Sequence, residues 1–139
     1  MSYTVEQLKI GMFSNFEKTI TETDVQLFAG VSGDINPIHI SKLAGERSIF
    51  GSRVAHGILV SGLISAVIGM QLPGPGTIYL GQDIKFCAPV FIGDTINAQA
   101  EVIEIKKEKN IVKLATKCTN QEGKVVIEGV AIVMPPKGL

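Results

Sequence analysis

An acid and a base lie five residues apart in a segment that favours a turn, at Asp34 and His39. Gly33 can adopt backbone angles that are closed to other residues, and Asn36, which precedes a proline, is pushed toward extended geometry. We therefore expect the preceding helix to end near residue 32 and a loop to present both side chains. A carboxylate and an imidazole that face one point can hold and activate a water molecule.

The same residues also have an ordinary structural interpretation. Asp after Gly and Asn before Pro are common in turns, so Asp34 could simply cap the next turn. His39 could be a packed side chain that is hydrogen-bonded to the backbone. The chain has only two histidines, so few other acid–base pairs are available. Residue chemistry alone leaves both interpretations open.

A longer pattern surrounds this pair. The segment from Phe28 to His39 reads FAGVSGDINPIH, and it is followed at 54–57 by VAHG and then by an apolar segment rich in small residues. The pattern resembles the MaoC-like, R-specific enoyl-CoA hydratases of the hot dog fold, and the resemblance continues through 73–82 and 89–94. It implies a single α+β domain over 1–139, in which an antiparallel sheet wraps around a long apolar central helix.

The resemblance also implies a reaction. A water shared by Asp34 and His39 would add to C3 of a trans-2-enoyl-CoA whose carbonyl is bound by the backbone N–H of Gly57, giving the R-3-hydroxyacyl-CoA. We assign Asp34 as the base and His39 as the group that orients the water and protonates C2, although two coupled groups on one water leave this division open. Three further residues are expected to bind substrate or support the site: Asn36, which braces the loop, His56, which contacts the loop after the first helix, and Ser65, near the acyl pocket.

Gly57 stands where the central helix is expected to begin. Backbone N–H groups in a first helical turn lack partners and lie at the positive end of the helix dipole, so they can bind an oxygen that gains charge. Glycine is also a frequent helix N-cap, and position alone fits either role.

Asp34, His39 and His56 are also possible metal ligands. No His-x-x-x-His or cysteine spacing supports a metal site, and hydration of an enoyl thioester needs no metal where an oxyanion hole exists. We expect no metal and no cofactor. Cys87 and Cys118 lie in apolar, strand-like contexts, and we expect buried free thiols rather than a disulfide.

Three other functions on this fold were weighed. A thioesterase of this fold generally carries a carboxylate on or near the central helix, and residues 57–70 contain no Asp or Glu. A non-catalytic acyl-CoA binder would not require Asp34 and His39 together. A 3-hydroxyacyl-[acyl-carrier-protein] dehydratase stays open, because no basic cluster marks either CoA or a carrier protein as the partner.

Composition limits the partners. Thirteen basic and thirteen acidic residues cancel, so the chain lacks the positive charge that nucleic acid or an anionic membrane surface would require. The first residues lack the basic and apolar runs of a signal peptide, and we expect a cytoplasmic protein. Hydrophobic residues make up 45% of the chain, which favours an apolar surface buried against another subunit, in a homodimer or a higher homo-oligomer.

Periodicity gives the order of elements. Alternating residues predict a first strand over 11–20, and Thr21 with Asp24 forms a capping box for a helix whose apolar residues are Val25, Leu27, Phe28 and Val31. Residues 40–53 are polar and read as a segment that covers the site, with room for one helical turn at 41–44. The segment 57–70 is apolar on every side, so we expect protein all around it. Four strands are predicted to follow, over 78–88, 95–106, 111–119 and 124–134.

Overall fold

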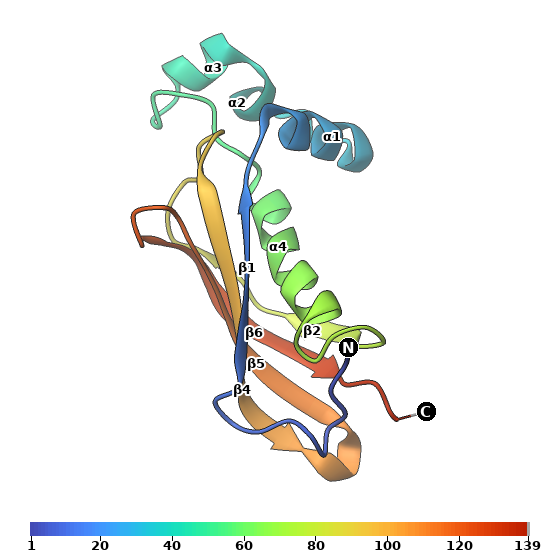
Figure 1. Ribbon diagram of the computed structural model, residues 1–139. Coiled ribbons are helices and arrows are strands. Elements are labelled where there is room, and N and C mark those ends of the chain that lie inside the picture. The colour runs from blue at the N-terminus through green and yellow to red at the C-terminus, as the bar shows by residue number, and fades with distance from the viewer. Residues whose placement is uncertain (139) are drawn as a thin grey trace.

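The computed structural model describes residues 1–138, which form one antiparallel sheet with a long helix on one face and further helices gathered at one end (Figure 1). The sheet order is β1-β4-β5-β6-β2, and β3 also pairs with β6. The elements in chain order are β1 Phe13–Thr19, α1 Glu22–Ser32, α2 Pro37–Ile40, α3 Lys42–Arg47, α4 Gly57–Met70, β2 Ile78–Gln82, β3 Lys85–Phe86, β4 Thr95–Lys106, β5 Ile111–Thr119 and β6 Val125–Met134.

The three consecutive strands β4, β5 and β6 form an antiparallel meander, as the alternating sequence predicts. Along β4, Ile96, Ala98, Ala100 and Val102 are fully buried, whereas the residues between them are at least partly exposed. Side chains of a strand alternate between faces, so this pattern turns one face of the sheet toward the core. The α+β hot dog architecture expected from the sequence is confirmed.

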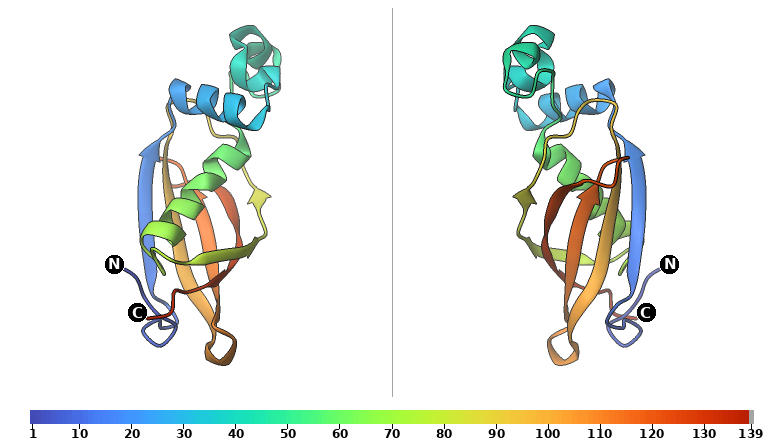
Figure 2. Two further views of the ribbon diagram at one scale, coloured as in Figure 1. Left: turned by 90° about the vertical axis from the view of Figure 1, so that its right-hand side faces the viewer. Right: turned by 90° about the vertical axis from the view of Figure 1, so that its left-hand side faces the viewer.

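Helix α4 lies across the core face of the sheet, and no helix covers the opposite face in the two side views (Figure 2). Its residues Val60, Ile64 and Val67 are buried against that sheet. Its other side is open, since the side chains of Ile58 and Met70 are 56% and 68% exposed. The described residues of this chain therefore cover one side of the helix, and the expectation of protein all around it stays a prediction for the open side. Among the described residues, no helix is long and apolar enough to cross a membrane.

Helix α1 begins with the capping box that the sequence predicts. The Thr21 side chain accepts a hydrogen bond from the Asp24 N–H at 3.1 Å, and the Asp24 carboxylate accepts one from the Thr21 N–H at 2.9 Å. The apolar face of α1 was only partly predicted, because Val25 is buried but Leu27 and Val31 are exposed. Residues two and six positions after Val25 point away from it on a helix, so they face solvent.

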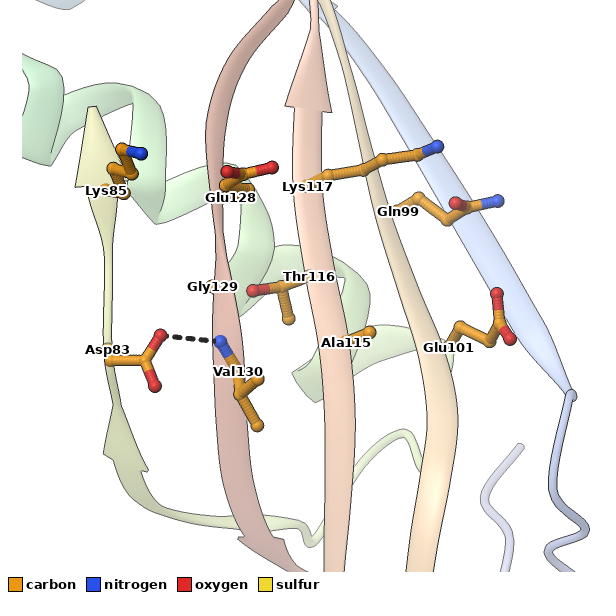
Figure 3. Close-up of a pocket in the computed structure, with 10 residues that line it drawn as sticks. All are labelled: Asp83, Lys85, Gln99, Glu101, Ala115, Thr116, Lys117, Glu128, Gly129 and Val130. Carbon is orange, nitrogen blue, oxygen red and sulfur yellow. Dashed lines mark hydrogen bonds between the residues drawn. The ribbon is translucent and has the colours of Figure 1, made fainter. Parts of the chain in front are cut away.

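The strand predicted over 78–88 is interrupted at Asp83. The backbone N–H of Asp83 donates to the Val130 carbonyl at 3.0 Å, and its carboxylate accepts from the Val130 N–H at 2.9 Å (Figure 3). This side chain replaces a backbone partner and divides the edge of the sheet into β2 and β3. It approaches β6 so closely that a Cβ at Gly129 would lie 2.0 Å from the Asp83 carbonyl oxygen.

The two cysteines differ in environment. Cys118 is fully buried on β5, as expected, and burial raises the pKa of its thiol to about 12. Cys87 is exposed, which contradicts the prediction of two buried thiols. It directly follows β3, the two-residue strand that pairs with β6.

Candidate active site

The segment that carries the acid and the base begins where α1 ends. Gly33 takes the left-handed conformation at φ 82° and closes the helix by donating to the Ala29 carbonyl. The loop predicted up to residue 39 is shorter than expected, because the four-residue helix α2 begins at Pro37. Proline is well tolerated in the first turn of a helix, and the Asn36 side chain caps α2 by accepting from the Ile38 N–H at 3.3 Å. The expected bracing role of Asn36 is thus visible as a helix cap.

Asp34 lies exposed in the turn between the two helices. One oxygen of its carboxylate accepts a hydrogen bond from the Asn36 N–H at 3.2 Å, which orients the side chain. A carboxylate oxygen of Asp34 and one ring nitrogen each from His39 and His56 lie within 4.8 Å of one another. The structure therefore brings together the acid and the base that the sequence singled out, with the second histidine beside them.

The imidazole of His39 is buried, and a single hydrogen bond fixes its tautomer. Its Nδ1 lies 2.7 Å from the carbonyl oxygen of Val54. A carbonyl can only accept, so Nδ1 carries the hydrogen. Nε2 is then the ring nitrogen that can exchange a proton with a bound molecule.

His56 connects the members of this cluster. Its ring stacks on the His39 ring with centroids 3.8 Å apart and planes inclined by 29°, and its Nε2 donates to the Asp34 backbone carbonyl at 2.9 Å. The edge of the Phe28 ring packs against it, with centroids 4.8 Å apart. The prediction that His56 contacts the loop after the first helix is confirmed. Its Nδ1 is buried and has no hydrogen-bond partner among the described residues.

The cluster of Asp34, His39 and His56 has donor atoms of the types that bind transition metals. Its geometry does not favour a shared ion. The lone pair of an imidazole nitrogen lies in the ring plane, and two stacked rings direct their lone pairs side by side instead of toward one point. The Nδ1 of His39 and the Nε2 of His56 are also used as donors to backbone carbonyls. This arrangement suits proton transfer better than metal binding.

Gly57 is the first residue of α4 and directly follows His56, which occupies the N-cap position. Its N–H has no acceptor among the described residues. A Cβ at this position would lie 2.5 Å from the ring of Phe86, so any larger residue would require this half-exposed ring to move. Gly57 and Phe86 also line a mostly apolar cavity of about 450 Å³, together with Ile58 at the start of α4.

Ser65 is not part of this cluster. It is exposed on the open side of α4, in a groove of about 420 Å³ between that helix and β2. Ser61, Gly62 and Tyr79 share the groove. Ile58 lines both this groove and the cavity beside Gly57, so the two hollows adjoin at that side chain.

A larger hollow of about 530 Å³ lies on the sheet face opposite α4, between Asp83 on one side and Glu101 on the other (Figure 3). Charged side chains such as Lys85, Lys117 and Glu128 surround it. None of its lining residues adjoins Asp34, His39 or His56 in the chain, so its larger volume does not make it the better candidate. The cavity at Gly57 is lined by Ile38, Ala55 and Gly57, the chain neighbours of His39 and His56, and this position favours it.

Sequence reasoning missed two contributors to the site. The backbone of Val54 accepts from the His39 ring and also donates to the Ile38 carbonyl at 3.2 Å. Arg53, the residue before it, forms a two-bond ion pair with Glu22. Backbone groups leave no mark in a sequence, and nothing local predicts a pair 31 residues apart.

Comparisons with known proteins show which family the chain is similar to. The family described as MaoC like domain matches residues 7–124. The chain is 50% identical to an (R)-specific enoyl-CoA hydratase of Rhodospirillum rubrum over 94% of this chain and 90% of that one, and 44% identical to a 3-hydroxybutyryl-CoA dehydratase of Methylorubrum extorquens over 95% and 83%. The solved R-hydratase PhaJ1 from Pseudomonas aeruginosa superposes with a TM-score of 0.92 at 45% identity, over 97% of this chain and 86% of that one. With a match that spans most of its length, this chain belongs to the MaoC-like domain family.

Proposed function

We propose that this protein is an R-specific enoyl-CoA hydratase, a hydro-lyase that adds water to trans-2-enoyl-CoA and gives R-3-hydroxyacyl-CoA. The observation that carries the proposal is the cluster of Asp34 and His39 next to the N-terminus of α4. An acid, a base and a free helix N–H are the groups that hydration of a thioester-conjugated double bond requires. The relatives named hydratase and dehydratase support the same reaction in its two directions.

The reaction begins with polarisation of the thioester. The carbonyl oxygen accepts a hydrogen bond from the Gly57 N–H at the positive end of α4, which withdraws electrons from C3. A water held between Asp34 and His39 attacks C3 as one of these groups removes its proton. The negative charge that passes to the thioester oxygen is stabilised by the same N–H. Protonation of C2 then completes the addition of one water.

The hydrogen bond of His39 identifies the ring atom that exchanges the proton. Its Nδ1 donates to the Val54 carbonyl, so only Nε2 can exchange a proton with water or with C2. Asp34 is exposed and keeps one carboxylate oxygen free of the Asn36 N–H, so it can accept the proton of the attacking water. Asp34 is therefore assigned as the base, and His39 as the group that orients the water and protonates C2 through Nε2. Because Nδ1 keeps its own hydrogen, Nε2 must carry a second ring proton when addition begins, and the proton that Asp34 takes from water restores it afterwards.

The test is hydration of crotonyl-CoA, followed by the loss of absorbance of the conjugated thioester, with chiral analysis of the product. The expected product is R-3-hydroxybutyryl-CoA. Absence of turnover, or formation of the S product, contradicts the proposal. The same assay with the acyl-carrier-protein thioester shows which carrier is preferred, and a clear preference for the carrier protein would favour the dehydratase alternative.

We further propose short substrates with acyl chains of about four to six carbons, because each buried methylene contributes roughly 0.8 kcal/mol only until the chain meets a wall. The cavity at Gly57 and the groove at Ser65 adjoin at Ile58, which supports a tail path past this side chain. Catalytic efficiency should hold or rise from C4 to C6 and then fall. An optimum at twelve carbons or beyond would contradict this limit.

A second copy of the chain is the proposed cover for the open side of α4. Ile58 and Met70 are exposed there, and β2 forms one edge of the sheet with Ile78 and Leu80 also exposed. Edge strands and apolar faces of this kind are usually covered or paired. The working unit is then at least a homodimer, with the substrate groove near the boundary. Sedimentation that shows an active monomer at assay concentration would contradict this.

A further inference from the structure

One ion pair joins the two segments that carry the acid and the base. Arg53 Nη1 lies 2.9 Å from Glu22 Oε2, and Arg53 Nη2 lies 2.5 Å from Glu22 Oε1. Two parallel bonds of this kind fix orientation as well as distance, because the guanidinium is planar. The Arg53 side chain is only 21% exposed, so the pair is partly shielded from solvent.

Each end of the pair leads directly to a member of the site. Glu22 is the first residue of α1, and the far end of that helix leads into Asp34. Arg53 precedes Val54, whose carbonyl fixes the His39 ring and whose N–H donates to the Ile38 carbonyl. Arg53 Nη1 also reaches the His39 carbonyl at 3.5 Å. The pair therefore closes a loop that runs from Glu22 along α1 to the Asp34 turn, on to His39, and back through Val54 to Arg53.

Helix α3, in the segment 40–53, packs on the same residue. A Cβ at Gly45 would lie 2.5 Å from the Arg53 backbone nitrogen, so α3 packs directly on the Arg53 main chain. A displaced Arg53 would shift α3 as well as Val54. Small displacements matter here, since a misplacement of about 1 Å can lower a catalytic rate by roughly a hundredfold.

An arginine near a CoA-dependent site has an obvious second use, which is a contact to a phosphate. Arg53 does line a hollow of about 400 Å³ together with Lys42. Both terminal nitrogens of its guanidinium are nevertheless bonded to Glu22, and a phosphate would have to displace that carboxylate. The two roles predict different kinetics. A phosphate contact would affect KM, whereas a positioning contact would affect kcat.

We propose that Arg53, held by Glu22, is a positioning residue that sets the distance between Asp34 and His39, an inference that rests on the proposed hydratase function. Arg53→Met should lower kcat on crotonyl-CoA by about tenfold to a hundredfold and leave KM within about twofold. Glu22→Gln keeps the size of the side chain and should lower kcat in the same direction. The exchange Glu22→Arg with Arg53→Glu should recover part of the loss.

Asp24→Asn is the matched control. It breaks the ion pair between Asp24 and Lys18, at 2.6 Å, on the same first turn of α1, but this pair does not lead to His39. Its kcat should stay within about twofold of the wild-type value. Equal losses of kcat in Asp24→Asn and Arg53→Met would show a general effect of loosening α1 and would overturn the proposal.

A second measurement does not depend on activity. The chain has two histidines, so nuclear magnetic resonance of imidazole nitrogens gives two sets of signals, which His39→Gln assigns. Arg53→Met, or Glu22→Gln if that variant does not fold, should move the His39 signals, and Asp24→Asn should leave them in place. Unmoved signals overturn the positioning role, as does a rise in KM with kcat unchanged. If the wild-type protein hydrates no enoyl-CoA, the proposed function fails while the nuclear magnetic resonance result still decides whether Arg53 holds His39.

Discussion

The meander of β4, β5 and β6 and the segment from Thr21 to Gly57 are held in place by different kinds of contact. In the meander, backbone groups pair with backbone groups along each strand pair, with one register shift in each, and buried and exposed side chains alternate along β4. In the second segment, which we call the catalytic cap, side chains bond to distant backbone. His39 reaches Val54 and His56 reaches Asp34, across 15 and 22 residues. The meander is fixed by a repeated local pattern, and the catalytic cap by a few single contacts.

The largest expected effect is the loss of chemistry without loss of fold. Asp34→Asn and His39→Gln are near-isosteric, and each should lower turnover of enoyl-CoA at least about a hundredfold, the scale of a positioned acid or base. The sheet does not depend on either side chain, so circular dichroism should be unchanged. Near-wild-type turnover in either variant, on every enoyl-CoA tested, would show that the pair is misassigned.

The contrast between local patterns and single distant contacts also explains which features the sequence could predict. The bounds of β4 and β5 agree with those read from alternation, and the capping box of α1 agrees with Thr21 and Asp24, because both signals are local. Asp34 and His39 were found from residue type and spacing, and the comparisons support the family that their pattern resembles. The division of the edge strand at Asp83 was not predictable, since it depends on a carboxylate meeting β6 47 residues away.

The next largest effect is expected on the stability of the sheet and not on catalysis. Gly129→Ala places a Cβ against the Asp83 backbone, and the strand must shift, so we expect a loss of about 2 kcal/mol in the free energy of unfolding. Gly62→Ala is the control, because a Cβ there meets nothing within 4 Å, and a helical Ala is favoured over Gly by up to about 1 kcal/mol. Denaturant titration measures both. Equal stability of Gly129→Ala and wild type would refute the close approach.

A smaller, pH-dependent effect on stability is expected at the start of the catalytic cap. Hydrogen bonding to Lys18 is the main cause that holds the pKa of Asp24 below its usual value, with the Thr21 N–H second. A lowered folded-state pKa stabilises the protein above the unfolded-state value and loses that contribution as pH falls through the folded-state value. Asp24→Asn should therefore cost about 1 kcal/mol at pH 7, and little once pH lies well below about 3.9. A difference that persisted at pH 2 would assign the effect to packing.

The smallest expected effect compares a thiol inside the meander with a thiol outside it. Cys118 lies inside the meander, where burial raises its pKa to about 12 and keeps it as an unreactive thiol at neutral pH. Cys87 is exposed and lines the cavity next to Gly57. Iodoacetamide should modify Cys87 in the native protein and Cys118 only after unfolding, as mass spectrometry can show. Cys87→Ser should change stability by less than about 0.5 kcal/mol.

The groove between α4 and β2 is lined by none of Asp34, His39 and Gly57. Its walls can therefore be substituted one by one while the acid, the base and the free helix N–H keep their places. Selection on acyl chain length and selection on turnover would then act on separate sets of positions. Such a separation makes the protein a practical starting point for evolving new substrate ranges, because libraries restricted to Ser61, Ser65, Tyr79 and Leu80 leave the reacting groups intact.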